Sequence, residues 1–281
     1  MQAVSYAKIN LHLEILGKLP GDYHQVDTVI CCIDLYDSIK YVLTKKQGIK
    51  LWSNLPELAD KNNLMFKVAS YIQGKYQPLC GIEMRLEKRI PVSAGLGGGS
   101  SNAANVIMAL NNLWNLNLSE PEKHEIAAIF GSDINFFLQG GTARCTNRGE
   151  IIRQCEDIVI DHILLVNPAI AISARETYQK AQIPVASQIQ RFDPLLGVSG
   201  WFNRLESGIR KDYPVIDGII DDMQSYAARI AMMSGSGSTC FGIFAGKDAM
   251  RECLEHFARQ GFWTKVTRTI RKEEYQQCIQ N

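Results

Sequence analysis

A run of small residues at positions 91–101, with the sequence Pro-Val-Ser-Ala-Gly-Leu-Gly-Gly-Gly-Ser-Ser, constrains most strongly what this chain can fold into. Alternating apolar and charged residues at 82–87 predict a half-buried strand before it, and apolar residues at helical spacing over 103–114 predict a helix after it. Glycines let the backbone approach a ligand closely, and a helix start offers unpaired N–H groups and partial positive charge. This glycine loop, residues 91–101, is therefore a candidate phosphate site.

A flexible surface loop is the alternative interpretation of any single glycine run. Two familiar phosphate loops do not fit the residues present. The Walker form ends in Gly-Lys-Ser/Thr, and no lysine lies between Lys88 and Lys123. The dinucleotide form needs a third glycine at the position of Ser100. If the glycine loop binds phosphate, it belongs to another class of site.

Length and charge bound the class of protein. A length of 281 residues predicts one large or two modest domains, and a formal net charge of +1 argues against a nucleic-acid binder with a broad basic surface. No apolar run is long enough to cross a bilayer, and no signal peptide precedes the first predicted strand. We expect a cytoplasmic protein.

The cysteines support the same expectation. The chain has eight of them and no Cys-x-x-Cys pair. Cys31 and Cys32 are adjacent and would point to opposite faces of a strand, which argues against a shared metal. We expect the cysteines to be reduced and to lie in or near the core.

The first strand is predicted at residues 8–15, where apolar residues alternate with polar ones that include Lys8 and Asn10. A lysine and an asparagine two residues apart on one face can both reach into a cleft. The alternative is a solvated outer face. Apolar residues at 29–33 and 39–43 predict two further strands.

Two predicted helices in the first half precede a lone carboxylate. Apolar residues at 64–72 indicate a helix that ends near Gly74. A second helix begins at Ser119, where Ser-x-x-Glu forms a capping box, and ends at Gly131. Asp133 follows directly, between this helix end and an aromatic run.

The pattern restarts at about residue 156. We expect, in order, a buried strand at 158–166, a helix capped by Ser173, a helix at 215–230, a small-residue loop at 234–241 that runs into a strand, a helix at 249–258 and a strand at 263–266. No internal repeat or long linker is visible, so the two predicted domains, residues 1–155 and 156–281, should pack closely.

Several short motifs occur in a specific order over nearly the whole chain. They are Ala-Lys-Ile-Asn-Leu at 7–11, Gly-Asp-Tyr-His at 21–24, the glycine loop, Gly-Ser-Asp at 131–133 before Phe-Phe-Leu at 136–138, Gly-Gly-Thr-Ala-Arg at 140–144, Arg-Gly-Glu at 148–150 and the small-residue loop at 234–241. Together they resemble the galactokinase, homoserine kinase, mevalonate kinase and phosphomevalonate kinase (GHMP) superfamily. Within it, the chain is similar to the kinases of 4-diphosphocytidyl-2-C-methyl-D-erythritol, with residues 181–232 weakly matched.

The resemblance implies an α/β (α+β) fold of two domains. The N-terminal, nucleotide-binding domain would be ribosomal protein S5 domain 2-like and the C-terminal domain ferredoxin-like, with the active site in the cleft between them. The implied reaction is ATP-dependent phosphorylation of the 2-hydroxyl of 4-diphosphocytidyl-2-C-methyl-D-erythritol, in the methylerythritol phosphate route to isoprenoid precursors. ATP and Mg²⁺ would take part, without a protein metal-ligand cluster. We expect a monomer or weak homodimer with no nucleic-acid or membrane partner.

The resemblance also implies the reacting groups. Asp133 would be the general base that takes the proton of the attacking hydroxyl, and Lys8 would keep that carboxylate charged. Asn10, on the same strand face as Lys8, would hold the substrate. An isolated aspartate at such a place could instead be a solvated carboxylate at a helix end.

The nucleotide would bind to the glycine loop. The residues implied are Pro91, Val92, Ser93, Ala94, Gly95, Leu96, Gly97, Gly98, Gly99, Ser100 and Ser101. Asn63 matches an adenine-side position. Gly235, Ser236 and Gly237 form a second loop that could contact phosphate or pack on the glycine loop, and the sequence does not separate these roles.

The cytosine ring would lie between two aromatic positions, Tyr23 and Tyr178. Stacking does not distinguish cytosine from uracil, so a hydrogen bond to the base edge must do so, and His24 is the candidate. The alternative for Tyr178 is a helix residue packed on the core.

Two residues depart from the family pattern. Asn102 stands where the family usually has Asp, which puts any metal contact there in doubt, and Asn135 stands where it usually has Pro. Two other functions are open: another GHMP-type alcohol kinase, such as a homoserine or mevalonate kinase, and a catalytically silent nucleotide-binding homologue. Nucleic-acid binding is a third and is disfavoured by the near-neutral charge.

Overall fold

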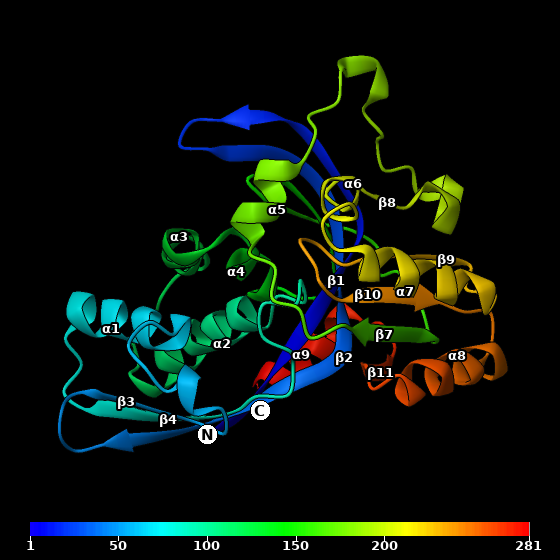
Figure 1. The fold of residues 1–281 in the computed structure, drawn as a ribbon. Helices are drawn as coiled ribbons and strands as arrows, with labels where there is room; N and C mark the ends of the chain where they lie inside the picture. The colour runs from blue at the N-terminus through cyan, green and yellow to red at the C-terminus, as the bar shows by residue number, and fades with distance from the viewer. Residues whose placement is uncertain (281) are drawn as a thin grey trace.

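The computed structural model describes residues 1–280. Its first sheet has seven strands, drawn in blue to green in Figure 1 except β8. They are β1 (Gln2–Leu19), β2 (Tyr23–Thr44), β3 (Ile49–Ser53), β4 (Gly81–Glu87), β5 (Thr142–Asn147), β6 (Ile151–Gln154) and β8 (Phe202–Asn203). The order is β3-β4-β2-β1-β8, and β5 pairs with β2 and β6. The sheet is mixed, because β1 pairs antiparallel with β2 and parallel with β8.

The first two strands form one long hairpin that organises this sheet. The prediction of two strands at 29–33 and 39–43 was wrong, because β2 runs unbroken through both. One part of β2 pairs with β5 and a later part pairs with β4, while β1 pairs along nearly its whole length. Bulges in the β1 pairing absorb the bends that such a length requires.

Helices cover one face of the first sheet. They are α1 (Leu64–Tyr76), α2 (Gly98–Leu113), α3 (Glu120–Phe130), α4 (Ser132–Phe137) and α9 (Lys272–Gln280), with a 3₁₀ turn at Pro56–Leu58. The capping box predicted at Ser119 is present. Helix α1 continues past Gly74 and ends at a left-handed Gln77, so the predicted end was two residues short.

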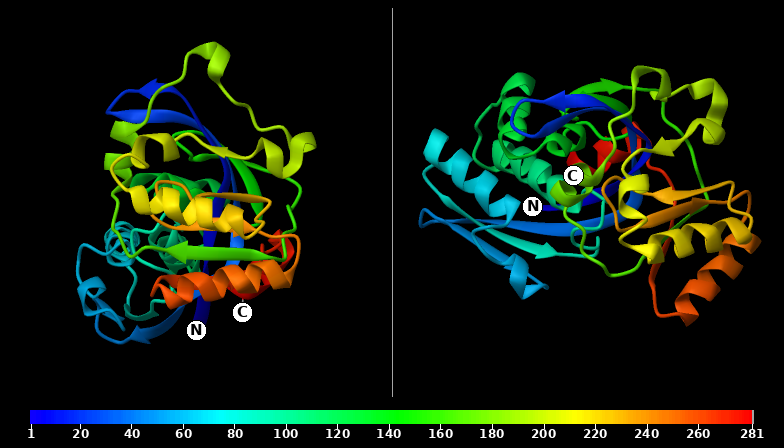
Figure 2. Two further views of the ribbon diagram at one scale, coloured as in Figure 1. Left: turned by 45° about the vertical axis from the view of Figure 1, so that its right-hand side comes forward. Right: turned by 45° about the horizontal axis from the view of Figure 1, so that its top comes forward.

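The last helix returns to the first half of the molecule. Helix α9, which the sequence pattern did not predict, lies beside β1 (Figure 2). Tyr275 is buried in the same apolar cluster as the helices α1 to α4, and its hydroxyl donates to the Phe137 carbonyl at 2.6 Å. The two ends of the chain therefore stabilise the same layer.

The second sheet has four antiparallel strands in the order β11-β7-β10-β9. They are β7 (Ile163–Asn167), β9 (Ile230–Met233), β10 (Cys240–Ile243) and β11 (Trp263–Thr267). Its helices are α5 (Ala174–Lys180), α6 (Glu206–Ile209), α7 (Pro214–Ser225) and α8 (Lys247–Arg259), and 3₁₀ turns lie at Ala186–Gln188 and Pro194–Gly200. Strand, helices, two strands, helix, strand in this order is the ferredoxin-like arrangement.

Two boundaries in this half differ from the prediction. The strand predicted at 158–166 begins only at Ile163, and the helix predicted at 215–230 ends at Ser225. Apolar residues on both sides of each boundary hide the change of structure, because burial alone does not mark where a strand or helix begins.

Three apolar clusters hold the molecule together, and the third joins the two sheets. It combines Ala7, Ile9 and Leu11 of β1 with residues of the second sheet such as Leu165 and Phe241. The apolar face of β1 therefore packs against the second sheet. The polar residues of β1 point to its opposite face. No described helix, over residues 1–280, is both long and apolar enough to span a bilayer.

All eight cysteines are free. Cys31 and Cys32 are buried on opposite sides of β2, as the alternation of a strand requires. Cys155 is exposed, so the expectation of a core or near-core position was wrong for that residue.

Candidate functional site

A cleft of 780 Å³ opens between the two halves. It is lined by these residues proposed from the sequence: Lys8, Asn10, Tyr23, His24, Ser100, Asp133, Tyr178, Gly235 and Ser236. The two halves supply the walls, because Tyr178, Gly235 and Ser236 come from the second half and the others from the first. Residues far apart in the sequence thus share one cavity.

The polar side of β1 faces this cleft, so the solvated outer face is excluded. Lys8 Nζ donates to Asn10 Oδ1 at 2.6 Å and lies 3.8 Å from Asp133 Oδ2. The Asn10 amide nitrogen donates in turn to Thr28 Oγ1 at 2.9 Å. The Lys8 side chain is 5% exposed and that of Asp133 43% exposed. A fixed cation thus stands beside a carboxylate that remains open to the cleft.

Burial lowers the pKa of Lys8, and the neighbouring Asp133 carboxylate opposes that change. Asp133 lies in the first turn of α4 and not at the end of the preceding helix. A carboxylate in a first turn interacts favourably with the helix dipole. The pair thus sets an accessible carboxylate beside a buried ammonium, an arrangement that a general base can use.

Further along β1, the polar side chains are covered by residues of the second half instead of facing the cleft. Glu14 is fully buried and accepts two hydrogen bonds from Arg204, each at 2.7 Å. The Gln190 N–H also donates to Glu14, and His12 contacts the Gln190 carbonyl. The segment before β8 therefore seals this end of the strand and leaves Lys8 and Asn10 for the cleft.

The glycine loop leads into α2, whose first residue is Gly98. Its N-cap, Gly97, is left-handed with φ 68° and provides no side-chain cap, which leaves the helix start available to an anion. A Cβ at Gly97 would lie 2.9 Å from the Phe137 ring and 3.0 Å from Lys8 Cγ. Only glycine therefore fits between β1 and α4.

The glycine loop enters the cleft mainly through its end. Ser100 lines the cavity, and the neighbouring Ser101 Oγ is buried without a hydrogen-bond partner. Ala94 and Leu96 belong to the apolar contact between the sheets, and Leu96 O accepts from Lys8 N at 3.0 Å. The other predicted loop residues do not line this cavity: Pro91, Val92, Ser93, Gly95, Gly97, Gly98 and Gly99.

Asn63 lies at the outer side of the glycine loop. Its side chain caps α1 by accepting from Met65 N at 2.9 Å and donates to Leu58 O at 2.8 Å. Leu64, the next residue, is 3.8 Å from the position of a Cβ at Gly99. Asn63 is therefore close to the start of α2, and its side chain already serves as the N-cap of α1.

The second loop both packs on the glycine loop and reaches the cleft. Ser234 Oγ donates to Gly95 O at 3.0 Å, and a Cβ at Gly95 would lie 2.1 Å from Ser234 O. Gly235 lines the cleft, and a Cβ there would lie 3.0 Å from Lys8 Nζ. Gly237 faces Met233 instead and does not line the cavity.

The aromatic residues at the cleft are arranged differently from the predicted sandwich of two tyrosines. His24 stacks on Tyr178, with ring centroids 5.4 Å apart and an interplanar angle of 28°. Tyr23 is 51% exposed, and the Arg148 guanidinium lies over its ring at 4.7 Å. Burial, assisted by Lys18, lowers the pKa of His24, which favours a neutral imidazole.

The two departures from the family pattern have partners in the structure. Asn102 is buried and donates to Asp37 Oδ2 at 3.0 Å. Asn135 is also buried, and His124 Nδ1 donates to its Oδ1 at 2.7 Å, which joins α3 to α4. Both amides therefore serve contacts between elements.

Sequence reasoning missed other residues of the cleft wall. Lys18 lies near the tip of the β1–β2 hairpin and Arg175 in the first turn of α5, while Thr28 lies beneath Asn10. Lys18 and Arg175 are ordinary surface residues in sequence, and only the meeting of the hairpin with α5 makes them neighbours of one cavity. Their charge suits a ligand that carries phosphate.

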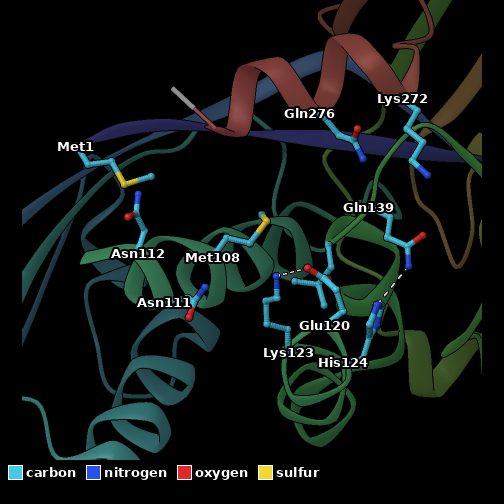
Figure 3. A pocket seen from close by; sticks show the side chains of 11 residues that line it. Met1, Met108, Asn111, Asn112, Glu120, Lys123, His124, Gln139, Lys272 and Gln276 are labelled. Carbon is cyan, nitrogen blue, oxygen red and sulfur yellow. Dashed lines mark hydrogen bonds and ion pairs between the residues drawn. The ribbon is translucent and has the colours of Figure 1, made fainter. Parts of the chain in front are cut away.

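A second pocket, of 520 Å³, lies away from the cleft between α2, α3 and α9 (Figure 3). Lys272 and Gln276 of α9 face Asn111 and His124 across it, and Gln139 contacts His124 Nε2 at 3.2 Å. None of the predicted site residues lines it. Over residues 1–280, no group of three or more His, Cys, Asp or Glu side chains is arranged to hold a metal.

Two family models match the chain: the GHMP kinases N terminal domain over residues 63–141 and the GHMP kinases C terminal domain over residues 183–261. The 4-diphosphocytidyl-2-C-methyl-D-erythritol kinase of Thermoanaerobacter pseudethanolicus is 37% identical, with 95% of this chain and 96% of that protein covered. The chain belongs to the 4-diphosphocytidyl-2-C-methyl-D-erythritol kinase family. It is therefore a kinase with the two-domain GHMP fold.

Further relatives agree with this family. The kinase of the same name from Alkaliphilus oremlandii is 38% identical, with 90% of this chain and 91% of that protein covered. The crystal structure of a 4-(cytidine 5'-diphospho)-2C-methyl-D-erythritol kinase superposes with a TM-score of 0.81 at 27% identity, covering 96% of this chain and all of that one. A mevalonate kinase structure superposes with a TM-score of 0.68 at 15% identity, which shows the shared fold alone.

Proposed function

We propose that this kinase transfers the γ-phosphoryl group of ATP to the 2-hydroxyl of 4-diphosphocytidyl-2-C-methyl-D-erythritol. The pair of Lys8 and Asp133, 3.8 Å apart in the interdomain cleft, carries the proposal. The membership of the family supplies the substrate, since the relatives are kinases named for that alcohol. The exposed Asp133 carboxylate and the buried Lys8 ammonium support a base and its charged partner.

The Asp133 carboxylate accepts the hydroxyl proton as the substrate oxygen attacks the γ-phosphorus and the bond to the ADP oxygen breaks. Lys8 stabilises the charge that develops during transfer and holds the carboxylate ionised until the proton arrives. Asn10 fixes the Lys8 ammonium through its hydrogen bond and can orient the alcohol. The contribution of such positioned proton transfer is about 10²–10⁴-fold.

The uncapped start of α2 and the adjoining glycine-loop amides bind the ATP phosphates, with Ser100 facing the cleft. Ser100 and Asp133 offer hard oxygen donors that fit a Mg²⁺ ion held mainly by phosphates and water. When bound, that ion would neutralise charge on the β- and γ-phosphates. In this proposal Asn63 keeps its role as the cap of α1, beside the nucleotide.

The cytidine end binds on the opposite side of the cavity. The stacked His24 and Tyr178 rings form one aromatic surface, and Tyr23 with its Arg148 neighbour forms another. A neutral His24 can donate to or accept from the base edge, which is how cytosine would be distinguished from uracil. The cations Lys18 and Arg175 at the same cavity suit the substrate's diphosphate.

ADP formation with a panel of alcohols tests the proposal. We expect turnover of the cytidine-diphosphate compound, and at most trace turnover of the same alcohol without its cytidine diphosphate, of the uridine analogue, of homoserine and of mevalonate. Equal activity with and without the cytidine diphosphate would overturn the substrate assignment. ATP binding without turnover of any alcohol would favour the catalytically silent alternative.

Four expectations from the sequence complete the proposal. The protein acts as a monomer or weak homodimer in the cytoplasm, without a nucleic-acid or membrane partner. Its two domains meet at residues 155 and 156, with α9 packed back on the first domain. Sedimentation at working concentrations measures the first of these.

A further inference from the structure

We propose that Asp37 is a positioning residue that fixes the geometry of the phosphate-binding glycine loop by tying both of its ends to one buried carboxylate. This inference rests on the proposed function, since it concerns how the same loop holds ATP. Asp37 lies in β2, outside the cleft and outside all motifs that mark the family in the sequence. Its side chain is fully buried.

The first end of the loop is held through the backbone. Asp37 Oδ1 accepts from Arg89 N at 2.7 Å and from Ile90 N at 2.9 Å. These two residues immediately precede Pro91, where the glycine loop begins. The carboxylate therefore sets the direction in which the chain leaves β4 for the loop.

The second end is held through a side chain. Asp37 Oδ2 accepts from the Asn102 amide at 3.0 Å, and Asn102 lies in α2 directly after Ser100 and Ser101. Because Asn102 lies near the start of α2, this bond places the N-terminal turn of α2 relative to β2. One carboxylate thus bridges the eleven positions between Ile90 and Asn102, a segment that contains the whole phosphate cradle.

A buried cation balances this carboxylate. Lys88 Nζ donates to Asp37 Oδ2 at 2.5 Å, and a Cβ at Gly98 would lie only 2.7 Å from that nitrogen. An ammonium so close to the positive end of α2 would be unfavourable alone. Asp37 compensates it, so the start of α2 stays available to the nucleotide's phosphates.

The same geometry explains why an amide occupies position 102. A carboxylate there would stand about as far from Asp37 as the present amide, at 3.0 Å, in a buried place with only Lys88 as counter-charge. Two like charges so close raise the energy of the folded loop. Asn102 is therefore a donor to Asp37 and not a metal ligand in this chain.

Three variants test the clamp by binding of ADP and of an ATP analogue, measured by calorimetry. Asp37→Asn removes the charge, Asn102→Asp adds one, and the double variant exchanges the two groups. We expect each single variant to weaken nucleotide affinity about tenfold or more, the size expected from a lost charge-assisted hydrogen bond. The double variant should recover to within about threefold of the parent, because one carboxylate and one amide are again paired.

Kinetics separate positioning from general destabilisation. The KM for ATP should rise in the single variants while the KM for the alcohol substrate stays within about twofold, since Asp37 is outside the cleft. Glu87→Gln is the matched control, because this exposed neighbour forms its ion pair with the exposed side chain of Arg89 and not with Asp37. It should change neither KM.

Asn102→Ala provides a second route if Asp37→Asn does not fold. It removes one arm of the clamp and leaves Lys88 and Asp37 paired. Unchanged nucleotide affinity in folded Asn102→Ala, or no recovery in the double variant, would overturn the proposal. Because binding is read without turnover, a parent that binds nucleotide tightly but phosphorylates none of the alcohols would contradict the proposed function and not the clamp.

Discussion

Two lysine–aspartate pairs lie on opposite sides of the glycine loop, and they are built for different tasks. In the cleft, Lys8 and Asp133 stand 3.8 Å apart, and the carboxylate is 43% exposed. Behind the loop, Lys88 and Asp37 are 2.5 Å apart, with side chains 5% and 0% exposed. The first pair leaves its carboxylate open, whereas the second leaves none of its oxygens free.

The difference shows that distance and access, more than residue type, decide what such a pair does. Asp37 is fully buried and accepts from four donors, so its oxygens are not open to a substrate. Asp133 has its lysine on one side and open cavity on the other. The same two residue types thus leave a carboxylate open to the cleft in one place and enclose it in the other.

The largest effect should follow from Asp133→Asn, which keeps the shape and removes the base. We expect kcat to fall about 10²–10⁴-fold with little change in the melting temperature. ADP release assays and thermal unfolding measure the two quantities. Equal kcat in the variant and the parent would remove Asp133 from the chemistry.

Lys88→Met tests the closed pair and should mainly change stability. It leaves the fully buried Asp37 without its cation, and a loss of about 3–5 kcal/mol in the free energy of unfolding is expected. Arg89→Met, at the next position but in an exposed pair with Glu87, should change the free energy of unfolding far less. Urea titrations measure both losses. A similar fall in the free energy of unfolding for the two substitutions would show that the buried pair of Lys88 and Asp37 does not stabilise the fold.

Tyr178→Ala tests whether the aromatic wall opposite Asp133 binds the base. Loss of stacking should weaken binding of the cytidine substrate by about 1–3 kcal/mol. The KM for this substrate should rise accordingly, and the KM for ATP should stay unchanged. Tyr178→Phe keeps the ring on His24 and should retain the parental KM. If Tyr178→Ala raises neither KM, the residue is part of the core alone.

The smallest expected effect is a change in the free energy of unfolding when the buried Lys8 is replaced. Its pKa is lowered by burial, so below that folded pKa the charged lysine makes folding less favourable. Lys8→Met should therefore raise the free energy of unfolding at pH 7, even though it removes the proposed partner of Asp133. The unfolded state binds more protons in the window between the folded pKa and the unfolded pKa of about 10.4, so the parent gains stability there as the pH rises.

Urea titrations at pH 7 and pH 10 measure the free energy of unfolding of Lys8→Met and of the parent. The excess stability of the variant should shrink at the higher pH. A parent that is more stable than the variant at pH 7 would contradict the prediction. Lys88→Met at the same two pH values is the contrast, because its loss should outweigh any gain from removing a buried charge.

The glycine loop and the capping box at Ser119 were predictable because each depends on a few neighbouring residues. A capping box joins groups three residues apart. A glycine such as Gly97 permits the positive φ angle that the turn into α2 needs. The long β2 strand was not predictable in the same way. Its middle carries mixed residues, and only pairing with β1, β4 and β5 holds it extended.

Asp37 shows most clearly where sequence reasoning stops. It belongs to a strand of ordinary pattern, and its partners Lys88 and Asn102 lie 51 and 65 residues away. No spacing rule connects them. By contrast, Lys8 and Asp133 were found from the order of family motifs, and the structure then placed both at one cleft.

By itself, the sequence determined the glycine-rich turn before a helix, the alternation of β1 and the order of motifs that marks a GHMP kinase, because these features depend on local residue types and spacings. Only the tertiary structure decided which face of β1 meets the cleft, that α9 returns to the first sheet, and that Asp37 braces the loop. These outcomes depend on which distant surfaces bury each other, and burial is a property of the assembled fold.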